Sequence, residues 1–132
     1  MLLKVSAANF KSFNEAVTLD LVSSTKVRSL ASHVVSLGEM KILRNAAIYG
    51  ANASGKTNLY RILRFLQDSL RNGRIPLGTG DWFCKLSESN KEKETIFDIQ
   101  YETKGRFFDY GFSALLADRR IVSEWLYELS PS

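Results

Sequence analysis

Residues 50–57 read Gly50-Ala51-Asn52-Ala53-Ser54-Gly55-Lys56-Thr57, and this G-x-x-x-x-G-K-T pattern decides what fold we expect of the chain. Glycine at both ends of a short loop permits the backbone angles that turn several N–H groups inward, around phosphate oxygens. A helix that begins directly after such a loop adds unpaired N–H groups and the positive end of its dipole. The stretch therefore predicts a phosphate-binding P-loop.

The side chains that follow the loop sharpen this prediction. Lys56 is expected to reach the β- and γ-phosphates, and Thr57 to place its hydroxyl on Mg²⁺. With Asn58 and the loop itself, these residues form the predicted site for a nucleoside triphosphate, ATP with Mg²⁺. The alternative is a glycine-bearing strand-to-helix turn that holds no ligand.

The flanking segments give the P-loop the setting that it needs. Residues 45–49 form a nearly uncharged run that suits a buried strand. A helical period then covers residues 55–71 and ends at Asn72-Gly73. The apolar stripe of this helix comprises Leu59, Ile62, Leu63, Leu66 and Leu70.

The rest of the chain reads as strands and loops. Residues 3–8 and 17–21 alternate and predict an N-terminal hairpin, and residues 23–40 and 74–94 read as loops. Residues 95–129 predict a three-stranded antiparallel meander. We expect an α/β fold in which a sheet holds the hairpin and residues 45–49, the helix packs on that sheet, and the meander flanks it.

Efficient hydrolysis needs acidic residues that the chain does not offer in the expected form. No run of four apolar residues is followed by Asp-Glu. The nearest candidates, Asp98 and Asp109, fit the alternation of the meander better, and Gln100 lies inside a predicted strand rather than in a sensor loop. His33 precedes the P-loop and reads as a surface or loop residue. The chain is expected to hold a triphosphate without the parts to split it efficiently.

Composition narrows the class of protein. The 132 residues suit a single domain, no stretch approaches the roughly 20 apolar residues of a membrane span, and the single Cys84 cannot form an internal disulfide. We therefore expect a cytoplasmic protein with no membrane contact. The net charge is +4, and residues 41–74 hold seven Lys/Arg against one acid, Asp68. This basic stretch indicates either a solvated helix face or a docking site for DNA, of which the first is favoured.

Three pieces of the sequence together resemble a known family. They are Asn9-Phe10-Lys11-Ser12-Phe13, residues 47–59 around the P-loop, and the meander pieces Tyr110-Gly111-Phe112 and 121–127. They resemble the N-terminal lobe of the ABC-like ATPases that include SMC and RecF proteins, and within that group the AAA-type ATP-binding proteins of abortive infection and OLD-like phage defence. The resemblance implies a mixed sheet, and places Lys11 and Ser12 near the adenine and ribose. The alternative for these two residues is an ordinary exposed turn.

The resemblance also implies parts that this sequence lacks. Such ATPases carry a later acid pair, a Leu-Ser-Gly-Gly signature and a switch histidine, and they sandwich ATP between two heads. Residues 1–132 thus resemble one partial ATP-binding domain, which exposes apolar surface and self-associates or binds a partner chain that completes the head. The alternative function is a nucleic-acid or protein interaction module whose nucleotide loop is vestigial.

Overall fold

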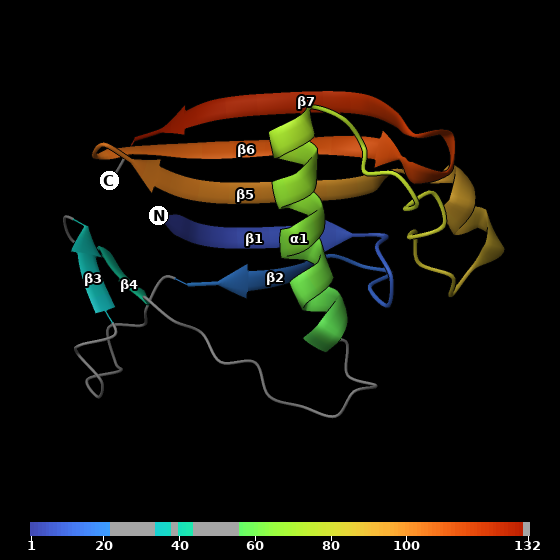
Figure 1. Ribbon diagram of the computed structural model, residues 1–132. Coiled ribbons are helices and arrows are strands. Elements are labelled where there is room, and N and C mark those ends of the chain that lie inside the picture. The colour runs from blue at the N-terminus through green and yellow to red at the C-terminus, as the bar shows by residue number, and fades with distance from the viewer. Residues whose placement is uncertain (22–33, 38–39, 44–55, 131–132) are drawn as a thin grey trace.

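A five-stranded antiparallel sheet crossed by one helix forms the body of the chain (Figure 1). The computed structural model describes residues 1–21, 34–37, 40–43 and 56–130. The strand order is β2-β1-β5-β6-β7, and every neighbouring pair is antiparallel. The strands are β1 (Leu2–Ala8), β2 (Val17–Asp20), β5 (Thr95–Thr103), β6 (Arg106–Leu115) and β7 (Arg120–Leu129).

The predicted hairpin and meander are both confirmed, but their relation differs from the prediction. β1 pairs with β2 on one side and with β5 on the other, so the meander continues the sheet instead of flanking it. The physical reason lies in β1, whose Leu3, Val5 and Ala7 are buried in strict alternation. A strand that buries one whole face and has both edges paired belongs in the interior of a sheet.

Residues 34–43 correct the prediction of a loop over residues 23–40. β3 (Val34–Leu37) and β4 (Met40–Leu43) pair in an antiparallel hairpin. Only two residues, Gly38 and Glu39, separate these apolar runs in the sequence, and this is the spacing of a β-hairpin. The predicted strand at residues 45–49 lies outside the described residues. The described sheets are antiparallel throughout, and the expected mixed sheet stays a prediction.

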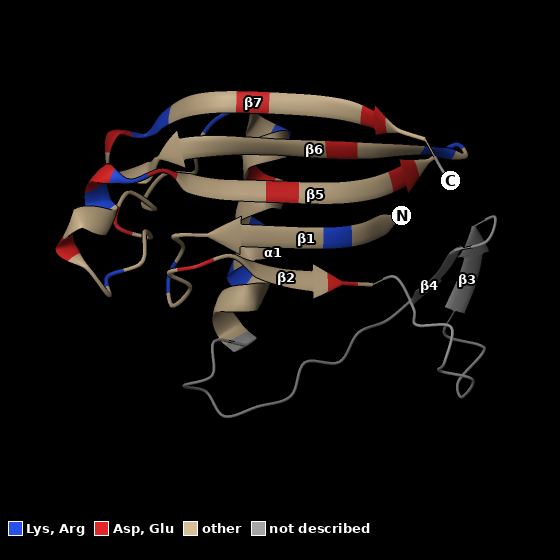
Figure 2. Cartoon of the chain, turned by 180° about the vertical axis from the view of Figure 1, so that it is seen from behind, with Lys and Arg blue, Asp and Glu red and all other residues tan. Residues whose placement is uncertain are grey.

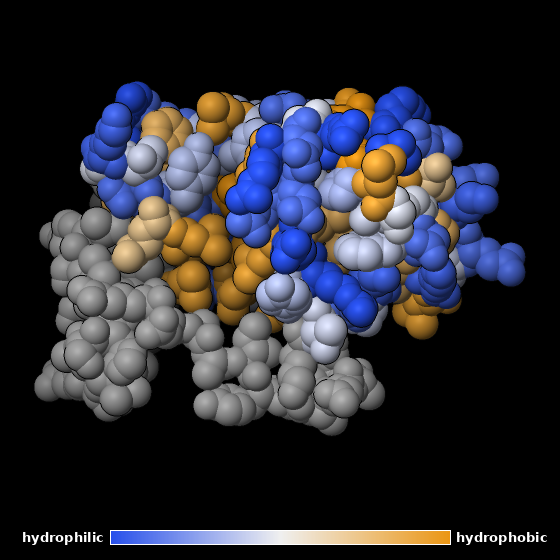
Figure 3. Space-filling model, in the orientation of Figure 1, coloured by the Kyte–Doolittle hydropathy of each residue, from blue (hydrophilic) through white to orange (hydrophobic). Residues whose placement is uncertain are grey.

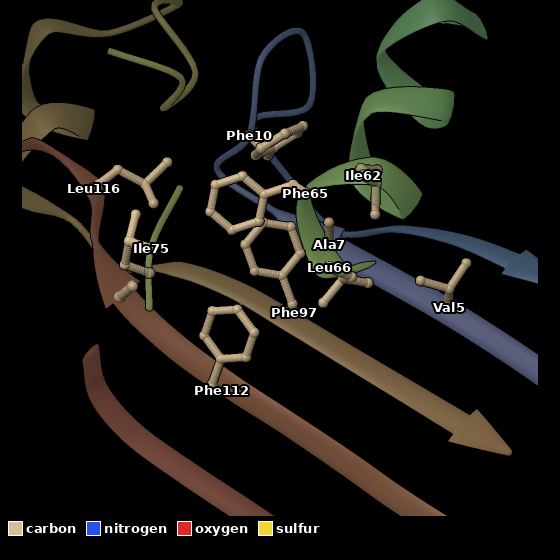
Figure 4. Close-up of a cluster of buried hydrophobic side chains, with 11 residues drawn as sticks. Val5, Ala7, Phe10, Ile62, Phe65, Leu66, Ile75, Phe97, Phe112 and Leu116 are labelled. Atoms are coloured by element: carbon tan, nitrogen blue, oxygen red, sulfur yellow. The ribbon is translucent and has the colours of Figure 1, made fainter. Parts of the chain in front are cut away.

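The helix α1 (Lys56–Asn72) begins and ends within one residue of the prediction. It covers one face of the sheet, and its buried side chains meet the aromatic residues of the strands (Figure 4). Phe65 packs against Phe10 and stacks on Phe97, with ring centroids 5.5 and 4.8 Å apart, respectively. Leu70, placed on the predicted stripe, is instead 49% exposed.

The opposite face of the sheet is open among the described residues, and acidic positions occur along β5, β6 and β7 (Figure 2). Residues 74–94 are irregular, as predicted, except for the short 3₁₀ helix η3 (Glu88–Glu92). A second one, η4 (Leu116–Asp118), joins β6 to β7. No helix in the described part of the chain has both the length and the apolar character needed to span a bilayer.

Candidate functional site

The first turn of α1 is the part of the predicted P-loop that the structure describes. The described part of the helix starts at Lys56, and Thr57 is exposed. The first turn carries no acidic residue that would compete with an anion for the helix N-terminus. The side chain of Lys56 and the residues Gly50, Ala51, Asn52, Ala53, Ser54 and Gly55 lie outside what the structure describes.

A direct hydrogen bond joins this first turn to the loop after β1. The Asn58 side-chain amide donates to the Ser12 hydroxyl at 3.0 Å, and the Arg61 guanidinium donates to the Asn58 side-chain oxygen at 2.8 Å. Forty-six residues separate Asn58 from Ser12 in the sequence. The fold therefore brings two segments of the predicted site, Lys11-Ser12 and Asn58, to one place.

The loop that carries Lys11 and Ser12 is a tight turn with little freedom. The backbones of Phe10 and Phe13 exchange two hydrogen bonds, of 3.0 and 2.8 Å. Lys11 has a left-handed backbone, with φ of 51°, and its N–H donates to the Trp82 carbonyl at 2.7 Å. Phe10 is fully buried against Phe65 of α1, so the turn is anchored to the helix that it faces.

Asn9 holds the base of this turn. Its buried side-chain amide donates to the carbonyls of Asn90 and Lys93, at 3.0 and 3.1 Å, and its side-chain oxygen accepts from the Cys84 N–H at 3.0 Å. Its own carbonyl accepts from the Thr95 hydroxyl at 2.7 Å. Asn9 also has a positive φ of 54°, which asparagine tolerates better than most residues. The side chain and the carbonyl of this one residue thus connect the turn to η3 and to the start of β5.

Lys11 lies in a positively charged environment. Its ammonium sits over the Trp82 ring, 4.1 Å from the centroid, in a cation–π contact. Burial lowers the pKa of Lys11, the charges of Arg61 and Lys85 lower it further, and only Asp81 acts in the opposite direction. An anion bound here would relieve the repulsion among these cations.

The chemistry of this corner fits a polyphosphate. It combines a helix N-terminus free of acids, an exposed threonine hydroxyl and the cations Lys11, Arg61 and Lys85. For a metal ion, Thr57 offers a single hydroxyl oxygen. The described residues contain no group of three His, Cys, Asp or Glu that could bind a metal by itself. Positive charge thus predominates among the described residues of this corner, although Lys85 also pairs with Asp81 at 3.4 Å.

The other residues considered in the sequence lie away from this corner. Asp98 and Gln100 of β5 alternate with Phe97 and Ile99, which pack towards α1, so both lie on the opposite face of the sheet. Gln100 donates to Asp109 at 3.1 Å there. Asp98 and Asp109 therefore both lie away from α1, in agreement with their prediction as meander residues. Cys84 is a buried free thiol, and His33 lies outside the described residues.

Sequence reasoning missed several residues of the corner. Asn9, Arg61 and Lys85 carried no assigned role. Asn9 had a usable signal, because an asparagine between an alternating strand and a turn is a frequent site of left-handed backbone. Arg61 and Lys85 had none, since only the folded chain brings them beside Lys11.

A family model matches most of the chain. The family model described as "AAA domain, putative AbiEii toxin, Type IV TA system" matches residues 46–132, about two thirds of the chain. The match takes in the predicted P-loop, α1 and the whole meander. No curated protein matches the chain significantly.

Proposed function

The chain belongs to the AAA-domain family whose description names the putative AbiEii toxin, and from that premise we propose that it is an Mg-ATP-binding lobe of an ABC/SMC-like ATPase. Membership of the AAA-domain family establishes the coarser function, a nucleotide-binding domain of the P-loop ATPase type. The finer assignment to the N-terminal lobe, and to a phage-defence or DNA-repair system, is our proposal.

One observation carries the proposal, the hydrogen bond between Asn58 and Ser12. It places the Lys11-Ser12 turn against the first turn of the helix that follows the P-loop. A nucleotide whose phosphates lie at the N-terminus of α1 would have its sugar and base within reach of that turn. Lys11 and Ser12 would then contact the nucleoside.

The roles of the P-loop residues follow from their chemistry. The N–H groups of residues 50–57 would surround the phosphates, and Lys56 would neutralise the β- and γ-phosphates. Thr57 would supply one oxygen to Mg²⁺, whose remaining ligands would be phosphate oxygens and water. The bound Mg²⁺ would offset the negative charge of the triphosphate.

Hydrolysis would need groups from elsewhere. Asp98 and Asp109 lie on the far face of the sheet, and the first turn of α1 carries no acid. We propose that residues 1–132 form a partial head, completed by a second copy, a partner chain or a further lobe. ATP would then be split only across that completed site.

Calorimetric titration with Mg-ATP tests the proposal. Lys56→Ala is expected to abolish measurable binding, because it removes the charge that faces the β- and γ-phosphates. Lys91→Ala, an exposed lysine of η3, is the matched control and should leave the affinity unchanged. Equal affinity of Lys56→Ala and the wild type would refute the proposal.

A second titration separates the Lys11-Ser12 turn from the P-loop. Ser12→Ala and Lys11→Met are expected to weaken ATP binding by about tenfold each, since each removes a hydrogen-bonding or charged group at the site. Inorganic triphosphate lacks the nucleoside, so Ser12→Ala should weaken its binding less than it weakens the binding of ATP. If the substitution weakened the binding of both ligands by the same factor, Ser12 would not contact the nucleoside.

The alternative function, a DNA-binding module with a vestigial loop, has weaker support. The exposed side of α1 is hydrophilic (Figure 3), and Arg61 and Arg64 lie on it. However, Arg64 pairs with Asp68 at 3.4 Å, and Arg61 is engaged with Asn58. DNA binding in nucleotide-free buffer, with a steep salt dependence, would favour this alternative.

A further inference from the structure

The turn that carries Lys11 and Ser12 has a backbone conformation that most residues avoid. Asn9 and Lys11 both have a positive φ, of 54° and 51°, in the left-handed region that is unfavourable for residues other than glycine. Such a conformation persists only where the surrounding structure holds it, and it is frequent at functional sites. The groups that hold this turn therefore bear on how the site recognises its ligand.

A buried asparagine far along the chain, Asn90 of η3, holds both ends of this turn. At the first end, the Asn90 carbonyl accepts from the Asn9 side-chain amide at 3.0 Å. At the other end, the Asn90 side-chain amide donates to the Asn14 side-chain oxygen at 2.8 Å. The same amide donates to the Cys84 carbonyl at 2.9 Å, and Asn90 is only 2% exposed. One residue thus fixes the separation between the two ends of a turn that lies 76 to 81 residues earlier in the sequence.

Asn9 closes this network, and its partners determine its orientation. The Cys84 N–H, which can only donate, faces the Asn9 side-chain oxygen at 3.0 Å. The side-chain nitrogen donates to three carbonyls, those of Asn90, Lys93 and Glu94, at 3.0, 3.1 and 3.4 Å. A carboxylate of the same shape would place an acceptor, rather than a donor, against these carbonyl oxygens. The network therefore requires amides, and not only side chains of the same size.

The turn is held from two sides. On one side, Ser12 accepts the hydrogen bond from Asn58 of α1 at 3.0 Å. On the other side, the Lys11 N–H donates to the Trp82 carbonyl at 2.7 Å, and the Lys11 ammonium lies 4.1 Å from the centroid of the Trp82 ring. Residues 82–90 thus fix where the turn lies relative to the helix that follows the predicted P-loop.

We propose that Asn90 and Asn9 are positioning residues for nucleotide recognition, an inference that rests on the proposed function. They hold the turn so that Lys11 and Ser12 contact the nucleoside. Both asparagines are buried beneath the turn, at 2% and 6% exposure, so they act through it rather than on the ligand. Their loss should weaken recognition of the nucleoside and leave the binding of phosphates by residues 50–57 unchanged.

Calorimetric titration of the intact 132-residue chain with ATP and with inorganic triphosphate, both with Mg²⁺, tests this inference. The readout is the ratio of the two affinities, because a general weakening of the fold lowers both alike. In Asn90→Asp and in Asn9→Asp this ratio is expected to fall about tenfold, through loss of binding to ATP. Asn72→Asp, the same substitution at the exposed end of α1, is the matched control and should keep the wild-type ratio.

Asn14 provides a variant that buries no new charge, because its side chain is exposed. Asn14→Ala removes the acceptor at one end of the turn and should lower the ratio about threefold. Asn14→Asp keeps an acceptor oxygen for Asn90 and should restore the ratio to near the wild-type value. Ile75→Val, which trims the core outside this network, should lower the melting temperature without changing the ratio.

A folded Asn90→Asp with the wild-type ratio would overturn the inference and leave the ATP proposal intact. If Asn90→Asp does not fold, an unchanged ratio in Asn14→Ala would overturn it in the same way. A wild type that binds neither ligand would refute the proposed function itself, and the positioning role would fall with it.

Discussion

Single residues in this chain have environments that change their chemistry, and Asp98 is the clearest case. Its carboxyl lies on the face of the sheet opposite α1, where the Trp125 indole donates to it at 3.0 Å. Burial raises the pKa of Asp98 from 3.8 to about 6, and a hydrogen bond with Asp109 and the charge of Asp109 act in the same direction. The hydrogen bond from Trp125 and the charge of Lys4 lower this pKa. The folded chain therefore binds this proton more tightly than the unfolded chain does.

A pH dependence of stability follows from Asp98. With the folded pKa above the unfolded one, the proton stabilises the fold fully below about pH 4, and this contribution is lost as pH rises through 6. We expect Asp98→Asn to flatten the free energy of unfolding over this range, and to raise it at pH 7 by about 1 kcal/mol once solvent screening of a partly exposed group is allowed for. Urea denaturation at several pH values measures this, with the exposed Asp118→Asn as control. An unchanged slope in Asp98→Asn would show that another group titrates there.

At the scale of elements, α1 shows what periodicity can and cannot decide. Its bounds followed from the stripe of apolar residues and from Asn72-Gly73, because these signals are local. The buried side of the helix was placed slightly wrongly. Phe65 and Ser69 are buried while Leu70 is 49% exposed, so the helix is rotated relative to the leucine stripe. The cause is tertiary, since Phe65 fits between Phe10, Phe97 and Trp82, all distant in sequence.

Because the helix is rotated in this way, truncation of Phe65, which lies off the predicted stripe, should destabilise the fold more than truncation of Leu70, which lies on it. Phe65→Ala should lower the free energy of unfolding by about 3–5 kcal/mol, because it leaves a cavity among three aromatic rings. Leu70→Ala should have an effect below about 1 kcal/mol, since half of the side chain is already in water. Thermal or urea unfolding of the two variants decides the matter. Equal losses would mean that the leucine stripe, rather than the observed face, packs on the sheet.

The candidate site shows the same division between local and long-range information. Lys56 and Thr57 could be predicted from eight consecutive residues, because a P-loop is a local structure. Lys11 and Ser12 came only from the resemblance to a family, and the Asn58–Ser12 hydrogen bond now gives a physical reason to connect them to α1. The hydrogen-bond partners of Asn9 and the position of Lys85 beside Lys11 could not be predicted from the sequence, since they depend on contacts that close across more than 70 residues.

At the scale of the whole molecule, the expected apolar surface is concentrated at one edge of the sheet. β7 is the last strand in the sheet order, and Ile121, Val122, Leu126 and Tyr127 are all more than 40% exposed. Among the described residues, no strand pairs with its outer edge. A long, apolar, unpaired edge favours pairing with another chain. It is therefore the surface on which we expect self-association or a partner.

Charge at this edge should oppose such association. We expect the wild-type chain to sediment with a concentration-dependent coefficient, and Leu126→Lys to shift it towards the monomer, because an edge lysine would have to be desolvated and brought near its copy. Leu77→Lys is the matched control, since Leu77 is 69% exposed and lies outside the sheet. A wild type that stays monomeric at all concentrations would contradict the prediction. Equal effects of the two lysines would place the association surface elsewhere than β7.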